Sequence, residues 1–374
     1  MTALPSGLVL FFTYGVSLRT WADGGLLDRE VELYRLLRPH VGHLAFVTYG
    51  GLEDLGYADR LDGIEVLPNR WGLPAFWMSL LAPLLYRRQI RQAAILKTNQ
   101  FHGAWTAVVA KVLFRKKLVV RGGFVWSVNR AREVRGAFSN WLARRLEGLA
   151  LRAADRAVVT SEWAKVYVVS RYRVEPERVR VIPNHVNTRL FAPDGGEREK
   201  GLVCFVGRLS PEKNLPALIE ALRGIPGARL RLIGGGAELE RLREQARDAD
   251  VVVEFTGSVP NPQLPALLNR AELFVLPSLY EANPKSLLEA MACGLAVLGS
   301  DVDGIREIIR PGETGSLCRP DAAGLRAGIE ALLADAPLRR RLGENARRHV
   351  LERNSIEAVL KLELDVLREA LGAP

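Results

Sequence analysis

The sequence is poor in cysteine and has no long apolar run, and each absence excludes a class of protein. Three cysteines occur among 374 residues, and Cys204, Cys293 and Cys318 lack the spacing of a metal site. We expect them to be buried thiols in a reducing cytoplasm. No apolar run reaches the roughly 18 residues that a membrane-spanning helix needs. Residues 1–12 lack a cationic leader and continue into a strand pattern, so we expect no signal peptide.

Length and hydrophobic pattern together predict two α/β domains. A chain of 374 residues exceeds what one hydrophobic core normally supports. From Gly7 onward, runs rich in Val, Ile and Leu alternate with helical patterns, which is typical of parallel sheets covered on both faces. The Gly- and Pro-rich stretch 192–197 predicts a boundary, with a first domain over 1–191 and a second over 192–354. We expect a C-terminal helix, about 355–374, to pack back on the first domain.

The excess of positive charge is confined to the first part of the chain. Residues 1–200 contain 30 of the 52 Lys and Arg but 18 of the 42 Asp and Glu. The excess is densest over 111–145 and would attract either anionic lipid or nucleic acid. The nearby segment 71–88, apolar with flanking arginines, fits either an interfacial segment or a core helix. No nucleic-acid-binding fingerprint accompanies the charge, so we expect an anionic membrane surface and no nucleic acid as partner.

The segment 276–294 carries two carboxylates eight positions apart. Residues 272–277 have the pattern of a short buried strand, and Pro284 suits the first turn of a helix. Glu281 would then lie on the loop, and Glu289 two turns into the helix. A helix rises about 1.5 Å per residue, so both carboxylates can face one ligand whose phosphates meet the free amides at the helix N-terminus. This spacing favours a sugar-nucleotide site over an amphipathic helix with solvated glutamates.

A second motif, 203–214, leads from an apolar strand into a cluster of cations. The Ser210 hydroxyl can cap a helix that begins with Pro211, and Arg208 and Lys213 can converge on an anion at its N-terminus. Without an anion, two cations at that end would be mildly unfavourable. Fixed cations there would favour departure of a nucleoside diphosphate.

Two further strand ends separate these motifs. Glycines 234–236 either bring the backbone close to a ligand or simply turn the chain. The run 253–260 is either an ordinary strand end or, by the family resemblance described next, the strand and turn that pack beside a nucleotide base.

Together these segments resemble the retaining glycosyltransferases of the GT-B fold, the large group-four family, also called glycosyl transferases group 1. The resemblance rests on Glu-x7-Glu, Leu-Leu-Glu-Ala-Met-Ala-Cys-Gly at 287–294, the pattern 296–309 and Gly-Arg-Leu-x-x-x-Lys at 207–213. It implies an α/β architecture of two Rossmann-like, doubly wound domains facing a central cleft. It also implies retaining hexosyl transfer from a nucleotide-diphosphate sugar as co-substrate, with no cofactor and no metal. Asp301 and Asp303 have metal-like spacing but belong to the strand-to-loop part of the resemblance.

The resemblance assigns roles on the donor side. Glu281 meets the sugar, Glu289 the ribose, and Arg208 and Lys213 the diphosphate, so that Glu281, Arg208 and Lys213 are the catalytic candidates. The implied donor-binding residues are Gly207, Arg208, Lys213, Gly235, Val259, Glu281, Ala282, Asn283, Pro284, Lys285, Ser286, Leu287 and Glu289.

The resemblance implies that the first domain binds the acceptor. The candidate loops are 13–21, 97–103 and 120–127, because each follows a predicted strand and should open at the carboxyl edge of the sheet. The acceptor-binding candidates are Gly15, Asn99, His102, Arg121, Gly122 and Trp126. Gly15 either admits substrate or only turns the chain, and Trp126 either stacks on a sugar or packs. Many family members carry a His-Gly pair after the fourth or fifth strand, where this chain has Arg121-Gly122-Gly123. His102 either takes a neighbouring role or is structural.

We therefore expect a cytoplasmic glycosyltransferase, peripheral on the inner face of the cell membrane, that acts on a lipid-linked or cell-surface glycan intermediate. A nucleotide-sugar epimerase of GT-B fold and a non-catalytic basic protein that binds membrane or nucleic acid are the alternatives. The pair Glu281 and Glu289 favours transfer over epimerisation, and the cation cluster disfavours a purely binding role.

Overall fold

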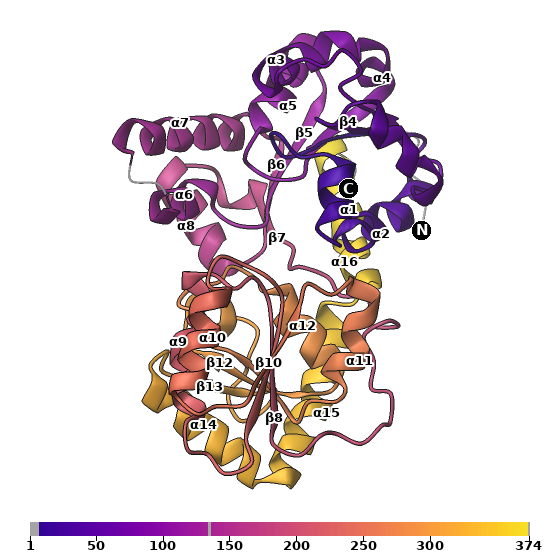
Figure 1. The fold of residues 1–374 in the computed structure, drawn as a ribbon. Helices are drawn as coiled ribbons and strands as arrows, with labels where there is room; N and C mark the ends of the chain where they lie inside the picture. The colour runs from indigo at the N-terminus through magenta and orange to yellow at the C-terminus, as the bar shows by residue number, and fades with distance from the viewer. Residues whose placement is uncertain (1–6, 134–135, 373–374) are drawn as a thin grey trace. The chain divides into compact units, whose positions relative to one another are not determined.

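Each predicted domain contains a parallel sheet with helices on its two faces (Figure 1). The computed structural model describes residues 7–133 and 136–372, and the chain separates into two units. The first unit holds the chain up to Pro183 and again from Leu360, and the second holds Asn184–Val359. Within the described ranges, none of the helices combines the length and the apolar character needed to cross a bilayer.

The sheet of the first unit has seven strands within the described residues, in the order β3-β2-β1-β4-β5-β6-β7. All neighbours pair in parallel. Strand β1 is buried along its whole length, because helices cover both faces of the sheet. The strands are β1 (Gly7–Phe11), β2 (Leu44–Val47), β3 (Glu65–Leu67), β4 (Ala93–Thr98), β5 (Lys117–Gly122), β6 (Arg156–Val159) and β7 (Val179–Val181).

Alternate side chains of these strands define two faces with different cover. One face, which includes Val9 and Leu96, packs against α3 (Ala75–Leu85), α4 (Arg87–Gln92), α5 (Ala104–Phe114), α7 (Ala137–Ala153) and α8 (Glu162–Tyr172). On the opposite face Phe46 contacts Tyr34, and Lys97 bonds Glu363. The elements on that face are α1 (Leu18–Asp23), α2 (Leu27–Leu37) and the C-terminal α16 (Ile356–Leu371). The remaining elements are α6 (Trp126–Glu133) and the 3-10 turns η1 (Arg38–His40), η2 (Leu52–Arg60) and η3 (Pro176–Arg178).

The second unit contains a sheet of six strands among its described residues, in the order β10-β9-β8-β11-β12-β13. Its strands also pair in parallel. They are β8 (Leu202–Val206), β9 (Arg229–Ile233), β10 (Val253–Gly257), β11 (Leu273–Leu276), β12 (Ala296–Ser300) and β13 (Ser316–Cys318). The helical elements are α9 (Leu215–Leu222), α10 (Leu239–Asp248), α11 (Leu264–Leu268), α12 (Lys285–Ala292), α13 (Asp303–Arg306), α14 (Ala322–Ala334), α15 (Ala336–Arg353), η4 (Pro211–Lys213) and η5 (Asn261–Gln263).

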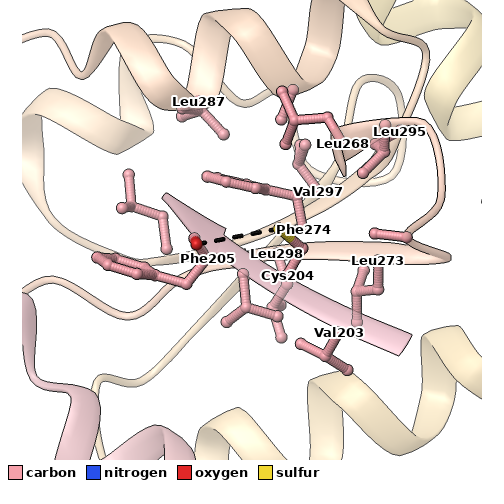
Figure 2. Packing of buried hydrophobic residues seen from close by; sticks show 14 of the residues in the cluster. Val203, Cys204, Phe205, Leu268, Leu273, Phe274, Leu287, Leu295, Val297 and Leu298 are labelled. Atoms are coloured by element: carbon pink, nitrogen blue, oxygen red, sulfur yellow. Dashed lines mark hydrogen bonds between the residues drawn. The ribbon is translucent and has the colours of Figure 1, made fainter. Parts of the chain in front are cut away.

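The core of the second unit forms where β8, β11 and β12 lie side by side. Figure 2 shows Phe205, Phe274 and Val297 from these strands with Leu287 of α12. All four side chains are fully buried. Strands β8 and β11 are the neighbours on which the candidate site depends, so this packing keeps their carboxyl ends together.

The boundary between the units lies at residues 183 and 184, not at 191 and 192 as the sequence analysis placed it. Residues 184–191 belong to the second unit because they are bonded to it. The Val186 amide donates to the Asn354 carbonyl oxygen at 2.8 Å, and Phe191 is buried in the second core. The C-terminal helix α16 begins at Ile356, and from Leu360 onward it belongs to the first unit.

The cysteines are free thiols, and two of the three are buried as predicted: Cys204 and Cys293. Cys318 is half-buried, because it lies on the edge strand β13. Burial raises the pKa of Cys204 and of Cys293 to about 12, and that of Cys318 to about 11. These thiols therefore stay protonated near neutral pH and are poor nucleophiles.

Candidate functional site

The loops that carry the two sequence motifs meet at the switch point of the second sheet. Strand β8 lies beside β11, and from these two strands the order runs outward in opposite directions. Ligands of open α/β sheets bind in the crevice outside the carboxyl ends of such neighbours. The Leu279 amide donates to the Glu212 carbonyl oxygen at 2.9 Å, and the Asn214 side chain donates to the Pro277 carbonyl oxygen at 3.1 Å. The two motifs therefore form one continuous surface.

An ion pair between Lys213 and Glu281 joins these loops. The Nζ of Lys213 donates to Oε1 of Glu281 at 2.6 Å, and the Ser278 hydroxyl donates to the same oxygen at 2.7 Å. The two charged side chains are only 17% and 11% exposed. A charge-assisted hydrogen bond with this shielding holds both groups in position. The sequence analysis gave Lys213 and Glu281 separate roles, and the structure shows that they contact each other directly.

The helix cap predicted for Ser210 does not form. Residues Pro211–Lys213 are a 3-10 turn, and the Ser210 hydroxyl donates to Oε1 of Glu212 at 2.5 Å. Helix α9 begins after Asn214, whose φ of 56° is left-handed. Burial acts to raise the pKa of Glu212, but the Ser210 hydrogen bond and nearby cations hold it below its ordinary value. Arg208 is 78% exposed, with Nη2 3.6 Å from Oε1 of Glu212, so a ligand can reach its guanidinium.

The glycine turn 234–236 lets three backbone segments approach one another. A Cβ on Gly234 would collide with the Gly207 carbonyl oxygen, and one on Gly236 would collide with the Leu209 carbonyl oxygen. The Leu209 amide donates to the Gly235 carbonyl oxygen at 2.9 Å. These glycines are thus required by close packing of the site's own loops, which keeps Gly207 and Arg208 at the strand end.

Glu289 lies in α12 and Glu281 on the preceding loop, as predicted. The Glu289 side chain is 3% exposed, and the Asn261 side chain donates to its Oε1 at 3.2 Å. Asn261 follows half-buried Val259 in the loop after β10, so this contact ties the third candidate loop to α12. Asn261 was missed by sequence reasoning, although its position two residues after Val259 placed it near the expected base site.

The residues at the start of α12 divide between the site and the core. Pro284 is the N-cap, and Lys285 and Ser286 begin the helix with partly exposed side chains. Leu287 points into the core, so only its backbone can approach a ligand (Figure 2). The Asn184 amide donates to Oδ1 of Asn283 at 2.9 Å, which anchors the loop.

Gly304 is a further residue of this surface that sequence reasoning did not single out. A Cβ there would collide with the carbonyl oxygens of Glu281 and Ala282. The loop after β12 therefore supports the Glu281 loop from behind, and only glycine allows the approach.

In the first unit the corresponding switch point lies between β1 and β4. The Tyr14 amide donates to the His102 carbonyl oxygen at 3.1 Å, and their rings lie 5.3 Å apart. The imidazole of His102 stacks on Trp126 with a centroid distance of 4.6 Å. Trp105 lies 5.4 Å from Tyr14 and 5.8 Å from His102. These half-buried rings form an aromatic cluster at the carboxyl edge, which can offer flat faces to a sugar.

The other acceptor candidates of the first unit differ in exposure. Gly15 is exposed with a φ of 76° and has open space around it, so a turn explains the glycine. Asn99 is buried and donates to the Thr13 hydroxyl at 3.4 Å. Gly122 packs against the Phe101 ring, which leaves no room for a side chain.

Arg121 lies elsewhere than predicted. It is part of β5, and its Nε is 3.5 Å from Oε1 of fully buried Glu363 in α16. The guanidinium therefore serves a buried charge cluster and is not presented at the loop. Nothing in the sequence indicated this contact, because Glu363 lies near the other end of the chain.

Two family models match consecutive parts of the chain. Residues 31–190 match "Glycosyltransferase Family 4", and residues 188–349 match "Glycosyl transferases group 1". The chain belongs to this glycosyltransferase family. Every donor-side candidate lies within 188–349. Every acceptor-side candidate except Gly15 lies within 31–190.

The chain is similar in sequence to curated relatives over part of their length. The chain is 29% identical over 260 residues to the alpha-maltose-1-phosphate synthase of Mycolicibacterium smegmatis, covering 62% of this chain and 66% of that protein. It is 34% identical over 246 residues to the D-inositol 3-phosphate glycosyltransferase of Acidothermus cellulolyticus, covering 58% and 54%. The match thus spans between about half and two thirds of these relatives.

Solved structures share the fold over almost the whole chain. A sucrose-phosphate synthase from Thermosynechococcus elongatus superposes with a TM-score of 0.79 at 23% identity, covering 99% of this chain and 100% of that one. Anabaena HepE in complex with UDP-glucose gives a TM-score of 0.76 at 18% identity, covering 97% and 99%. The predicted GT-B fold is confirmed.

The titration of His102 provides a test of the aromatic cluster. Burial lowers the pKa of His102 below its ordinary value of 6.5, and Arg130 acts in the same direction. We expect its NMR ring signals to titrate below 6.5 in the folded chain and near 6.5 in urea. Because the unfolded chain takes up this proton first, His102 should reduce stability as pH falls through 6.5. Titration at or above 6.5 in the folded chain would contradict the buried placement.

Proposed function

We propose that this chain is a retaining glycosyltransferase that moves a hexosyl unit from a nucleotide-diphosphate sugar to an acceptor hydroxyl. The observation that carries the proposal is the Lys213–Glu281 pair at the switch point of the second sheet. The names of the relatives support it, because both describe sugar transfer or the synthesis of a glycoside. The HepE structure, which contains UDP-glucose, supports a nucleotide-sugar donor.

The proposed chemistry follows from the charges at this surface. The bond between the anomeric carbon and the diphosphate oxygen breaks, and its electron pair leaves with the diphosphate. The acceptor oxygen bonds the same carbon on the same face, and its proton passes to an oxygen of the departing diphosphate. Lys213 and exposed Arg208 would stabilise the charge that grows on the departing diphosphate. When a diphosphate competes for the Lys213 ammonium, Glu281 becomes able to accept hydrogen bonds from sugar hydroxyls. Glu289 would bind the ribose.

Retention of configuration and independence of a cofactor or metal are carried over from the family resemblance and belong to the proposal. The acceptor is proposed to be a lipid-linked or cell-surface glycan intermediate, bound by the first unit. The enzyme would work in the cytoplasm, peripheral on the inner face of the membrane. The excess of cations in residues 1–200 supports such a location.

A thermal-shift screen against UDP-, GDP- and ADP-sugars tests the donor proposal. A ligand that binds only the folded chain stabilises it by about 2.7 kcal/mol at one hundred times its Kd. One base series should therefore raise the melting temperature more than the others. Incubation of the best donor with the enzyme alone distinguishes transfer from epimerisation, because an epimerase would convert the sugar without an acceptor. Absence of any shift with all three series would contradict a nucleotide-sugar enzyme.

Substitution of Glu289 provides a sharper test of the donor site. Glu289→Gln should weaken nucleotide binding by roughly 1.5–3 kcal/mol, because a hydrogen bond to a charged acceptor is lost. Isothermal calorimetry with the nucleoside diphosphate measures this loss. The matched control is Glu240→Gln, since Glu240 is 77% exposed on α10 and bonds only a helix neighbour among the described residues. Equal affinities in Glu289→Gln and the control would refute the ribose role.

A further inference from the structure

A long part of the first unit is almost free of acidic residues. Between residues 66 and 146 the sequence contains a single acid, Glu133. The same stretch contains fifteen Lys and Arg: Arg70, Arg87, Arg88, Arg91, Lys97, Lys111, Arg115, Lys116, Lys117, Arg121, Arg130, Arg132, Arg135, Arg144 and Arg145. Such a one-sided composition creates a strong positive field wherever the cations are exposed.

The fold places seven of these cations on helices that form one layer, or at the C-terminal ends of those helices. Helices α3, α4, α5 and α7 all cover the same face of the first sheet, through buried residues such as Met78, Ile90, Ala107 and Leu151 (Figure 1). The exposed cations of these helices and their C-terminal ends are Arg87, Arg88, Arg91, Arg115, Arg144, Arg145 and Arg152, and Lys117 is exposed at the start of β5. We call the outer surface of these four helices the α3–α7 surface.

Large apolar side chains are exposed among these cations. On α7 they lie at helical spacing, with Phe138 74%, Trp141 50%, Leu142 41% and Leu149 49% exposed. Helix α7 therefore has one apolar stripe in the core and a second stripe facing outward. The same surface exposes Phe76, Trp77 and Leu84 on α3, and Val112 and Leu113 on α5.

Aromatic and cationic groups are paired within this stripe. The Phe138 and Trp141 rings stack with centroids 5.8 Å apart, and the guanidinium of Arg145 lies 5.4 Å from the Trp141 centroid. The opposite face of the unit differs, because α1 and α2 mix acids with cations. On α2, Arg35 pairs with Asp28, which also pairs with Arg60 of η2. An apolar and basic surface on one face alone matches the chemistry of an anionic bilayer.

We propose that the α3–α7 surface docks the enzyme on a bilayer that contains anionic lipid. The aromatic and aliphatic side chains would enter the interface while the arginines contact lipid phosphates. The breadth of exposed apolar side chains favours a bilayer over nucleic acid, which would be bound through phosphate and base contacts. The proposal rests on the proposed function in one respect: docking would bring the first unit to the lipid-linked acceptor.

Vesicle flotation of the full-length chain tests this surface. The chain should float with vesicles of phosphatidylcholine and phosphatidylglycerol but not with phosphatidylcholine alone. Binding should weaken with salt, because the Debye length falls from about 10 Å at 0.1 M to about 3 Å at 1 M. Two variants, Phe138→Ser/Trp141→Ser and Arg144→Gln/Arg145→Gln, should each lower the vesicle partition coefficient on the order of tenfold.

The matched control lies on the opposite face. Lys361→Gln/Leu362→Ser removes one exposed cation and one exposed leucine from α16 and should leave flotation unchanged. Nucleotide affinity, measured by calorimetry, should be the same in all three variants, so loss of docking is distinguished from failure of the donor site. No flotation with anionic vesicles, equal flotation with neutral ones, or equal losses in control and α7 variants would overturn the proposal. Binding of RNA in preference to vesicles would also overturn it.

Discussion

Replacing Lys213 with alanine is expected to lower turnover by about 10²–10³-fold, equivalent to about 2.7–4 kcal/mol. The Lys213 ammonium lies 2.6 Å from Glu281 at the switch point of the second sheet. Its removal takes one fixed cation from the proposed leaving group and leaves the shielded Glu281 carboxylate with the Ser278 hydroxyl but without its cationic partner. The measurement is kcat at saturating concentration of the nucleotide sugar that stabilises the chain best. Circular dichroism should show an unchanged fold.

Two comparisons separate the causes of this loss. Arg208→Ala should also lower turnover, but it leaves the Lys213–Glu281 bond in place, because Arg208 lies beside Glu212. Arg223→Ala is the control, since Arg223 is 59% exposed at the C-terminal end of α9, and α9 begins near the site. Glu281→Gln should reduce turnover more than donor binding. Near-normal turnover in both Lys213→Ala and Arg208→Ala would refute the assignment of these cations to the leaving group.

The second large effect is expected from Glu363→Gln, which should lower the free energy of unfolding of the first unit by about 3–5 kcal/mol. Lys97 and Glu363 are fully buried and bonded at 2.5 Å, and Arg121 lies 3.5 Å from the same carboxylate. Without the carboxylate, two cations remain buried with a neutral partner. Denaturant unfolding followed by circular dichroism measures the loss.

Helix α16 also provides the control for this prediction. Glu369→Gln breaks ion pairs with Arg156 and Arg180 that are partly exposed, so the loss should stay within about 1 kcal/mol. A loss for Glu363→Gln no larger than for Glu369→Gln would contradict the buried cluster.

The effect of Glu363→Gln should also depend on pH. Burial acts to raise the pKa of Glu363, but Lys97 and Arg121 hold it below its ordinary value of 4.5. A carboxyl with a lowered folded pKa contributes stability that is present above 4.5 and lost as pH falls through the folded value. The difference between wild type and Glu363→Gln should therefore shrink in acid. A difference that grows below pH 4.5 would contradict this direction.

The sequence by itself determined the architecture and the position of each donor-side motif along the chain. Runs such as β8 and β11 are apolar at successive positions, and that local pattern predicts strands buried on both faces. The alternation of strands and helices then places the loop after each strand at the carboxyl edge of a parallel sheet. For this reason the positions of Glu281 on a loop and Glu289 on a helix could be predicted without coordinates.

Only the tertiary structure decided which of these groups meet. Lys213 and Glu281 are joined because β8 and β11 are neighbours in the sheet, and strand order is not encoded in the spacing of either motif. The Arg121 side chain is buried because it contacts Glu363, which lies on a helix near the far end of the chain. The α3–α7 surface likewise exists only because separate helices cover one face of the sheet. Local periodicity specifies how a segment folds, whereas contacts between distant segments depend on packing and on where each charge can be neutralised.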